Sequence, residues 1–110
     1  MQKINTDILR LKDILRAVTD IETIALTTIS SRTDLLATAY TISIIGEASS
    51  RISPELKKRH NYIPWQDIVS MRNRIIHEYG KVDIPLVIEV VKTHIPVLKK
   101  QIENILKTIS

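Results

Sequence analysis

Apolar residues recur every three or four positions through the first part of the chain. In residues 4–21 the series is Ile4, Ile8, Leu11, Leu15, Val18 and Ile21. This spacing places side chains on one face of an α-helix. Charged residues fall between them, among them Asp7, Lys12, Asp13, Arg16 and Asp20, and no Gly or Pro interrupts residues 1–45. The pattern predicts a long amphipathic helix at the start of the chain.

A second helix is predicted after a short polar segment. Residues 27–33 contain the only cluster of Thr and Ser in this part of the chain, so we expect a loop there, with Ser31 or Thr33 capping the next helix. Apolar residues then recur at helical spacing from about Asp34 to Ile52. Gly46 lies inside this helix, where it costs about 1 kcal/mol relative to Ala. We expect it where another helix backbone comes close, within the chain or across a dimer.

Two Pro-containing segments mark the next helix starts. Ser53 followed by Pro54 predicts a cap and a first helical position of a short helical turn. Ile63-Pro64-Trp65 predicts the start of a third main helix, which continues through Ile76. Gly80 stands where a left-handed C-terminal cap of this helix would fall.

The last helix is predicted to be irregular. Asp83 with Pro85 indicates its start, and Pro96 predicts a kink or break near Thr93 before residues 97–109 complete it. Taken together, the segments predict an all-α fold. We expect an up-and-down bundle of four main helices in a single domain, residues 1–110.

Composition narrows the class of protein. Ile, Val and Thr are abundant and Phe is absent, which alone would favour strands, but the helical periodicity outweighs that preference. The chain has no Cys, which excludes disulfides, thiolate metal sites and Cys nucleophiles. No apolar run approaches the roughly 20 residues of a membrane span, and Met1 opens onto a polar segment, so we expect a cytoplasmic protein.

The formal net charge of +4 is unevenly distributed. Residues 1–50 carry a small negative excess, whereas residues 51–110 carry the positive one. This distribution is compatible with an anionic partner. The run Lys57-Lys58-Arg59 is nevertheless first interpreted as solvated surface.

The densest polar cluster on an apolar helix lies between Met71 and Tyr79. On a continuous helix, Arg72 and Tyr79 would fall within about 20° of each other. Asn73 and His77 are four apart and would be neighbours, whereas His77 would lie about 140° from Arg72. One straight helix cannot aim both at a single small group. Either the helix bends or ends near His77, or a symmetric dimer completes the site.

These residue types suit the cleavage of RNA without a metal. His77 could take a proton from a 2′-hydroxyl, which then attacks the adjacent phosphate. Arg72 could bind that phosphate and the charge of the transition state, and Asn73 could hold the imidazole. The alternative from residues alone is that Arg72 and Arg74 form surface ion pairs and that His77 is a core histidine.

Five other residues have predicted roles. Trp65 is expected to plug the end of the bundle, and Tyr40 to form a core or dimer contact. Glu47, beside Gly46, could orient an Arg of the polar cluster. His60 and His94 have no carboxylate or second His at metal-ligand spacing, so surface roles are assigned to them and no metal site is expected.

Arg72, Asn73, His77 and Tyr79 resemble the signature of the HEPN superfamily, and specifically of its HepT-like branch. Further segments resemble the landmarks of that family in the same order: Ile44–Ala48, Ser53–Leu56, Ile63–Trp65 and Val82-Asp83. The resemblance extends from about Ile4 to Leu106. It departs after Tyr79, where the family often has an aromatic residue before Gly and this chain has Gly80 directly.

The resemblance implies a homodimeric, HEPN-like, metal-independent endoribonuclease that uses no cofactor. Such a protein would be the toxin of a type VII-like HEPN/MNT toxin–antitoxin pair, with RNA as substrate. Arg72 and His77 would be the catalytic pair at the dimer cleft, supported by Asn73. The partner would be a minimal nucleotidyltransferase of the MNT type, which neutralises the toxin by adenylylating Tyr79. The alternative is a non-catalytic helical binding partner of such a nucleotidyltransferase.

Overall fold

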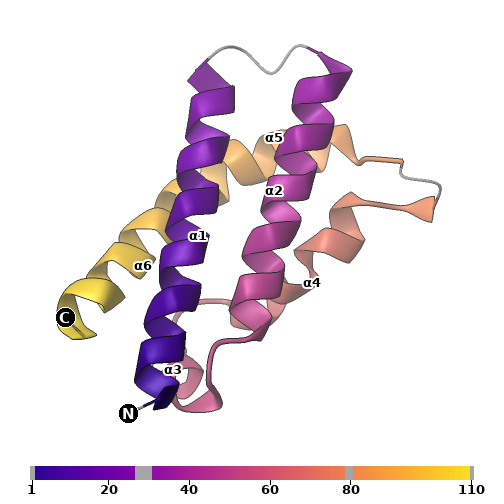
Figure 1. Ribbon diagram of the computed structural model, residues 1–110. Helices are drawn as coiled ribbons and strands as arrows, with labels where there is room; N and C mark the ends of the chain where they lie inside the picture. Colours follow the sequence, from indigo (N-terminus) through magenta and orange to yellow (C-terminus); the bar gives the residue numbers. More distant parts are fainter. Residues whose placement is uncertain (1, 27–30, 79–80, 110) are drawn as a thin grey trace.

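Two long helices form the spine of the molecule. The computed structural model describes residues 2–26, 31–78 and 81–109. Helix α1 (Gln2–Leu26) and helix α2 (Arg32–Ser50) run antiparallel and contact each other along their length (Figure 1). The predicted loop falls mostly on residues 27–30, which lie outside the described residues. Ser31 is the cap of α2, and its hydroxyl accepts the Asp34 N–H at 3.0 Å.

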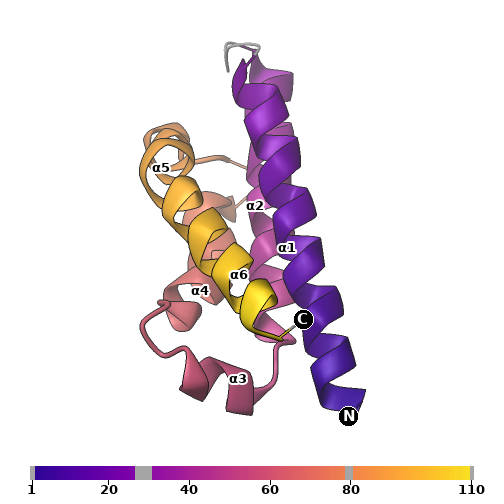
Figure 2. The same cartoon turned by 90° about the vertical axis from the view of Figure 1, so that its left-hand side faces the viewer.

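The remaining helices pack against one side of this pair. The short α3 (Pro54–Arg59) leads into α4 (Trp65–Ile75), which contacts α2. Helix α5 (Ile84–Glu89), the π-helical turn η2 (Val90–His94) and α6 (Ile95–Ile109) follow one another, and α6 crosses α1 (Figure 2). This arrangement confirms the predicted all-α fold. Among the described helices, none is long and apolar enough to cross a membrane.

The core lies where α1, α2 and the crossing α6 meet. Its largest fully buried apolar residues are Leu11, Ile14, Val18, Ile21, Ile63, Ile75, Val87, Ile102 and Ile105. Three of the six residues of the predicted apolar face of α1, Leu11, Val18 and Ile21, belong to this set, and Ile14 of the same helix joins them. Periodicity therefore identified the buried face of α1.

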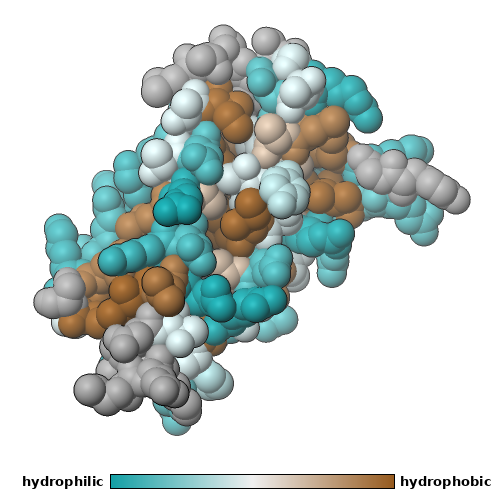
Figure 3. Space-filling view, viewed as in Figure 1, coloured by the Kyte–Doolittle hydropathy of each residue, from teal (hydrophilic) through white to brown (hydrophobic). Residues whose placement is uncertain are grey.

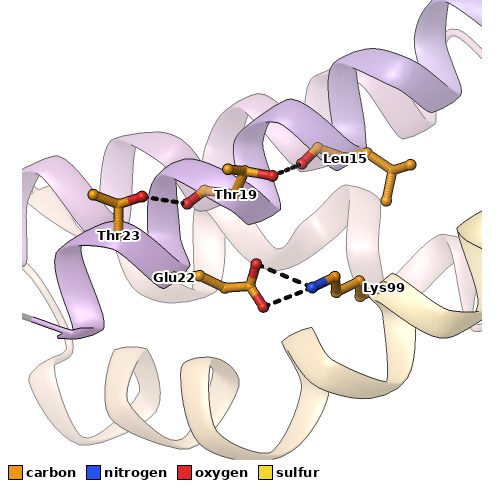
Figure 4. A network of polar contacts seen from close by, with 5 residues as sticks. All are labelled: Leu15, Thr19, Glu22, Thr23 and Lys99. Atoms are coloured by element: carbon orange, nitrogen blue, oxygen red, sulfur yellow. Dashed lines mark hydrogen bonds and ion pairs between the residues drawn. The ribbon is translucent and has the colours of Figure 1, made fainter.

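The Thr residues of α1 and α2 fit these helices because their hydroxyls bond to the backbone of their own helix. Figure 4 shows Thr19 donating to the carbonyl of Leu15 and Thr23 donating to that of Thr19, each at 3.0 Å. Thr38 and Thr41 repeat this bond within α2. A hydroxyl that bonds four residues back is satisfied without leaving the helix.

The predicted irregularity near Thr93 is confirmed, and it is a π-helical turn and not a break. The N–H of Ile95 reaches back five residues to the carbonyl of Val90. Pro96, directly afterwards, has no N–H, and its ring would crowd the carbonyl four residues earlier in an α-helix. The wider π-helical turn before Pro96 therefore lets α6 follow α5 without a break in the helical chain.

Gly46 lies at the closest approach of two helices, as predicted, but within one chain. A Cβ at this position would stand 3.0 Å from the carbonyl oxygen of Ile68 and 3.3 Å from that of Val69. Both are backbone atoms of α4. The missing side chain therefore brings α4, which carries the polar cluster, directly against α2.

The third main helix ends earlier than predicted. Helix α4 stops at Ile75, and Ile76 adopts an extended conformation and pairs with Val82 in an antiparallel bridge. The predicted continuation toward a cap at Gly80 is therefore wrong, although Gly80 itself lies outside the described residues. Leaving the helix lets both Ile76 and Val82 pack against the core.

Candidate functional site

Arg72 and Asn73 lie in the last turn of α4, and both side chains are exposed. The guanidinium Nη1 of Arg72 donates to Oδ1 of Asn73 at 3.2 Å. Asn73 therefore orients the arginine in this structure, and not the imidazole as predicted. Cations near the C-terminus of a helix interact favourably with its dipole, so the position of Arg72 is electrostatically favourable.

His77 follows the end of α4 and is held by its backbone. Its N–H donates to the carbonyl of Lys81 at 2.7 Å, and the N–H of Asp83 donates to that of Ile75 at 2.8 Å. These bonds pair the segment after α4 with residues 81–83, and the His77 side chain is exposed. The alternative of a core histidine is therefore wrong, and the possibility that the helix ends near His77 is confirmed.

The early helix end overturns two expectations based on helical geometry. Asn73 and His77 are not neighbours on one helical face, and no hydrogen bond joins their side chains in the part of the chain described. The helical angles that placed Arg72 and Tyr79 on one side of a helix do not apply beyond Ile75, where α4 ends. Tyr79 lies outside the described residues.

An open hollow of about 670 Å³ adjoins His77. It is lined by Ile76, His77, Glu78 and Lys81. Lys81 was not predicted as a site residue, because its place beside His77 depends on the backbone bond between these two residues. The pair of β-branched residues Ile75-Ile76 before Val82 was the available signal for an extended segment. Lys81 lines the same hollow, so the segment after α4 carries a cation beside an exposed imidazole.

Arg74 lines a different cavity. This second space, about 410 Å³, has an apolar floor from α2 and α6 that includes Ile42, Ile45 and Leu98. Arg74 lines it together with the exposed residues Asp67, Glu89 and His94. Arg74 therefore lines a cavity that Arg72 does not line, so Arg74 is a matched control for Arg72.

The other predicted roles have separate outcomes. Trp65 is buried, and its Nε1 donates to the carbonyl of His60 at 3.0 Å, as expected of a plug. Tyr40 is 66% exposed and is therefore not a core residue. Glu47 forms an ion pair with Arg51 at 3.3 Å and not with an arginine of the cluster. Within residues 2–26, 31–78 and 81–109, no three His, Asp or Glu side chains gather as metal ligands would.

Comparison with known proteins identifies one family. The family described as Ribonuclease HepT-like matches residues 4–105. The chain is 38% identical over 66 residues to a "putative RNase" of Caldanaerobacter subterraneus, a match covering 60% of this chain and 59% of the relative. It is 41% identical over 66 residues to a "probable ribonuclease HepT" of Thermococcus cleftensis, covering 60% of each protein.

A third relative shows how partial these matches are. A "gamma-glutamylcyclotransferase and putative RNase" of Methanocaldococcus jannaschii is 42% identical over 66 residues, which are 60% of this chain and 30% of that protein. The matched segment thus spans less than two thirds of each of these relatives. No solved structure matches the chain.

Proposed function

Because the chain belongs to the ribonuclease HepT-like family, we propose that it is an endoribonuclease that cuts RNA through Arg72 and His77 without a metal. One observation carries the proposal. Both side chains are exposed at the end of α4, where His77 lines an open hollow. A histidine and an arginine needed only for packing or ion pairing would be covered or paired.

The proposed reaction uses three groups of the chain. The imidazole of His77 takes the proton of a 2′-hydroxyl, and the 2′-oxygen attacks the adjacent phosphorus. The bond from phosphorus to the 5′-oxygen breaks, which leaves a 2′,3′-cyclic phosphate and a 5′-hydroxyl. The guanidinium of Arg72, oriented by Asn73, stabilises the negative charge that builds on the phosphate oxygens.

We further propose that two copies of the chain form the complete cleft. In the described part of the chain, no hydrogen bond joins the His77 side chain to that of Arg72, and the helix ends between them. Helix α2 exposes Leu36, Tyr40 and Ile44 at four-residue spacing, which forms an apolar stripe suited to a second helix. Figure 3 shows apolar surface between polar groups on the face that carries α1 and α2. In such a dimer, each cleft takes Arg72 from one copy and His77 from the other, and the protonated His77 returns its proton to the leaving 5′-oxygen.

The proposal extends to a toxin–antitoxin pair. The antitoxin would be a nucleotidyltransferase of the MNT type that transfers an adenylyl group to Tyr79. Tyr79 is two residues from His77 in the sequence, so an attached AMP would bring a phosphate to the catalytic cleft. That phosphate would then occupy Arg72 in place of RNA.

Expression in a bacterial host tests this function. We expect the wild-type chain to stop growth and fragment cellular RNA, and Arg72→Ala and His77→Ala to do neither. Arg74→Ala is the matched control, because it removes a neighbouring arginine that lines the other cavity. Toxicity that survives both Arg72→Ala and His77→Ala would contradict the catalytic assignment. Intact RNA with the wild type would instead favour the non-catalytic partner of a nucleotidyltransferase.

A further inference from the structure

The connection from α3 to α4 presents cations and an aromatic ring at one corner of the molecule. Three basic residues, Lys57, Lys58 and Arg59, form the last turn of α3, against one carboxylate, Glu55, in its first turn. Tyr62 follows with 59% of its surface exposed. We call Lys57–Arg59 together with His60 and Tyr62 the α3–α4 corner. Figure 2 shows α3 and this connection at the lower left, projecting below α4.

The tyrosine of this corner is held in place although its ring is exposed. Its hydroxyl lies 3.0 Å from Nδ1 of His60, and the two rings meet edge to face with centroids 5.7 Å apart. A long exposed side chain usually keeps its rotamer freedom. Here that freedom is already reduced before any ligand arrives.

The backbone beneath the ring is anchored as well. The carbonyl of His60 accepts the indole N–H of Trp65 at 3.0 Å and the N–H of Ile63 at 3.1 Å. Ile63 and Trp65 are both buried. At the other end of α3, Ser53 is bonded to the buried carboxylate of Asp7. Backbone bonds thus tie the corner to buried residues at both ends.

A fixed, exposed aromatic face beside several cations suits single-stranded nucleic acid. Cations bind the phosphate backbone, and a base stacks on the aromatic ring whatever its identity. An acidic protein surface would bind the cations, but the exposed tyrosine ring would have no role in that binding. We propose that the α3–α4 corner is a second RNA-binding site, which holds single-stranded substrate away from the cleaved bond.

This inference rests on the proposed function, in which RNA is the substrate, and helix α4 relates the two sites. Trp65 begins α4 at the corner and Ile75 ends it beside the site. Eleven helical residues span about 16 Å. A dinucleotide bound at His77 is too short to reach the corner, whereas a longer strand can occupy both. The corner should therefore affect long substrates and leave short ones unchanged.

Binding of RNA that cannot be cut tests the corner independently of catalysis. The probe is a fluorescent 2′-O-methyl oligonucleotide of about ten nucleotides, within the range that single-strand binders cover. We expect Tyr62→Ala to weaken binding about five-fold or more, and Tyr62→Phe, which keeps the ring, to weaken it less. The double variant Lys58→Ala/Arg59→Ala should weaken binding and flatten its salt dependence. Lys107→Ala, an exposed lysine at the end of α6, is the control.

Parallel assays separate failure of the corner from failure of the proposed function. Cleavage of a dinucleotide should be unchanged in the Tyr62 and Lys58/Arg59 variants, and KM for a long RNA should rise with kcat unchanged. If the wild type cleaves RNA but these variants bind the oligonucleotide as tightly as it does, the inference is wrong and the function stands. Competition by polyglutamate as strong as by RNA, with no effect of Tyr62→Ala, would also overturn it.

Discussion

The carboxylate of Asp7 in α1 accepts both the N–H of Ser53, at 2.8 Å, and its hydroxyl, at 2.6 Å. The Ser53 hydroxyl in turn accepts the N–H of Leu56, so it caps α3. One buried carboxylate thus joins α1 to the start of α3, which are 46 residues apart in the sequence. This bond sets where the chain turns after α2.

Removal of this carboxylate should destabilise the fold strongly. We expect Asp7→Ala to lower the free energy of unfolding by about 3 kcal/mol, because it leaves two partly buried donors of Ser53 without this partner. Chemical denaturation followed by circular dichroism measures the loss. Asp13→Ala is the control, since its half-exposed carboxylate lies 3.6 Å from Arg10 and should contribute no more than about 0.5 kcal/mol. Equal effects of the two substitutions would contradict the account.

Gly46→Ala should destabilise the chain although alanine favours helices. Alanine gains about 1 kcal/mol of helix propensity over glycine. The new Cβ would stand 3.0 Å from the Ile68 carbonyl oxygen, which is backbone and moves only with α4. We expect the separation of α2 from α4 to outweigh the gain, with a net loss of about 1–2 kcal/mol.

The same denaturation measurement has a matched control in α2. Ala37→Gly, at an exposed position of that helix, should cost about 1 kcal/mol through propensity alone. A stabilising effect of Gly46→Ala would show that α4 does not depend on this close approach.

Much of the fold can be predicted from the sequence, because it rests on local signals. The caps at Ser31, Ser53 and Asp83 follow from residue type and position, and the structure contains all three. The irregular turn before Pro96 likewise follows from the missing N–H of that residue.

Long-range contacts could not be predicted in the same way. Asp7 fits the polar positions of an amphipathic helix, and only its bond to Ser53 reveals why it is buried. The end of α4 at Ile75 depends on the bridge between Ile76 and Val82. No Gly or Pro marks that end, so the helical periodicity predicted a helix that was too long. The predicted contact between Asn73 and His77 depended on that longer helix and was therefore wrong as well.

Mixing two inactive variants tests whether the cleft is shared between copies. If each cleft takes Arg72 from one copy and His77 from the other, a heterodimer of Arg72→Ala and His77→Ala retains one intact cleft. Coexpression in equal amounts should restore about a quarter of wild-type cleavage, since half of the dimers are mixed. If both groups act from one chain, the mixture should remain as inactive as either variant alone.

Tyr79→Phe should keep RNA cleavage active and prevent its inhibition by the antitoxin. The variant lacks the hydroxyl that an adenylyl group would join, so we expect it to retain RNA cleavage and to escape the nucleotidyltransferase. The readout is RNA cleavage after incubation with the antitoxin and ATP, with Tyr62→Phe as the matched control that should still be switched off. A Tyr79→Phe variant that the antitoxin and ATP still silence would refute modification at this residue.

The most direct test of the central claim is cleavage of labelled RNA by the purified protein in the presence of EDTA. We predict that the wild type retains its full rate and forms 2′,3′-cyclic phosphate ends. His77→Ala should be slower by about a hundred-fold or more, because a general base contributes at least that much. His94→Ala, the matched exposed histidine, should cleave at the wild-type rate. Loss of wild-type cleavage with EDTA, or an undiminished rate in His77→Ala, would contradict the account.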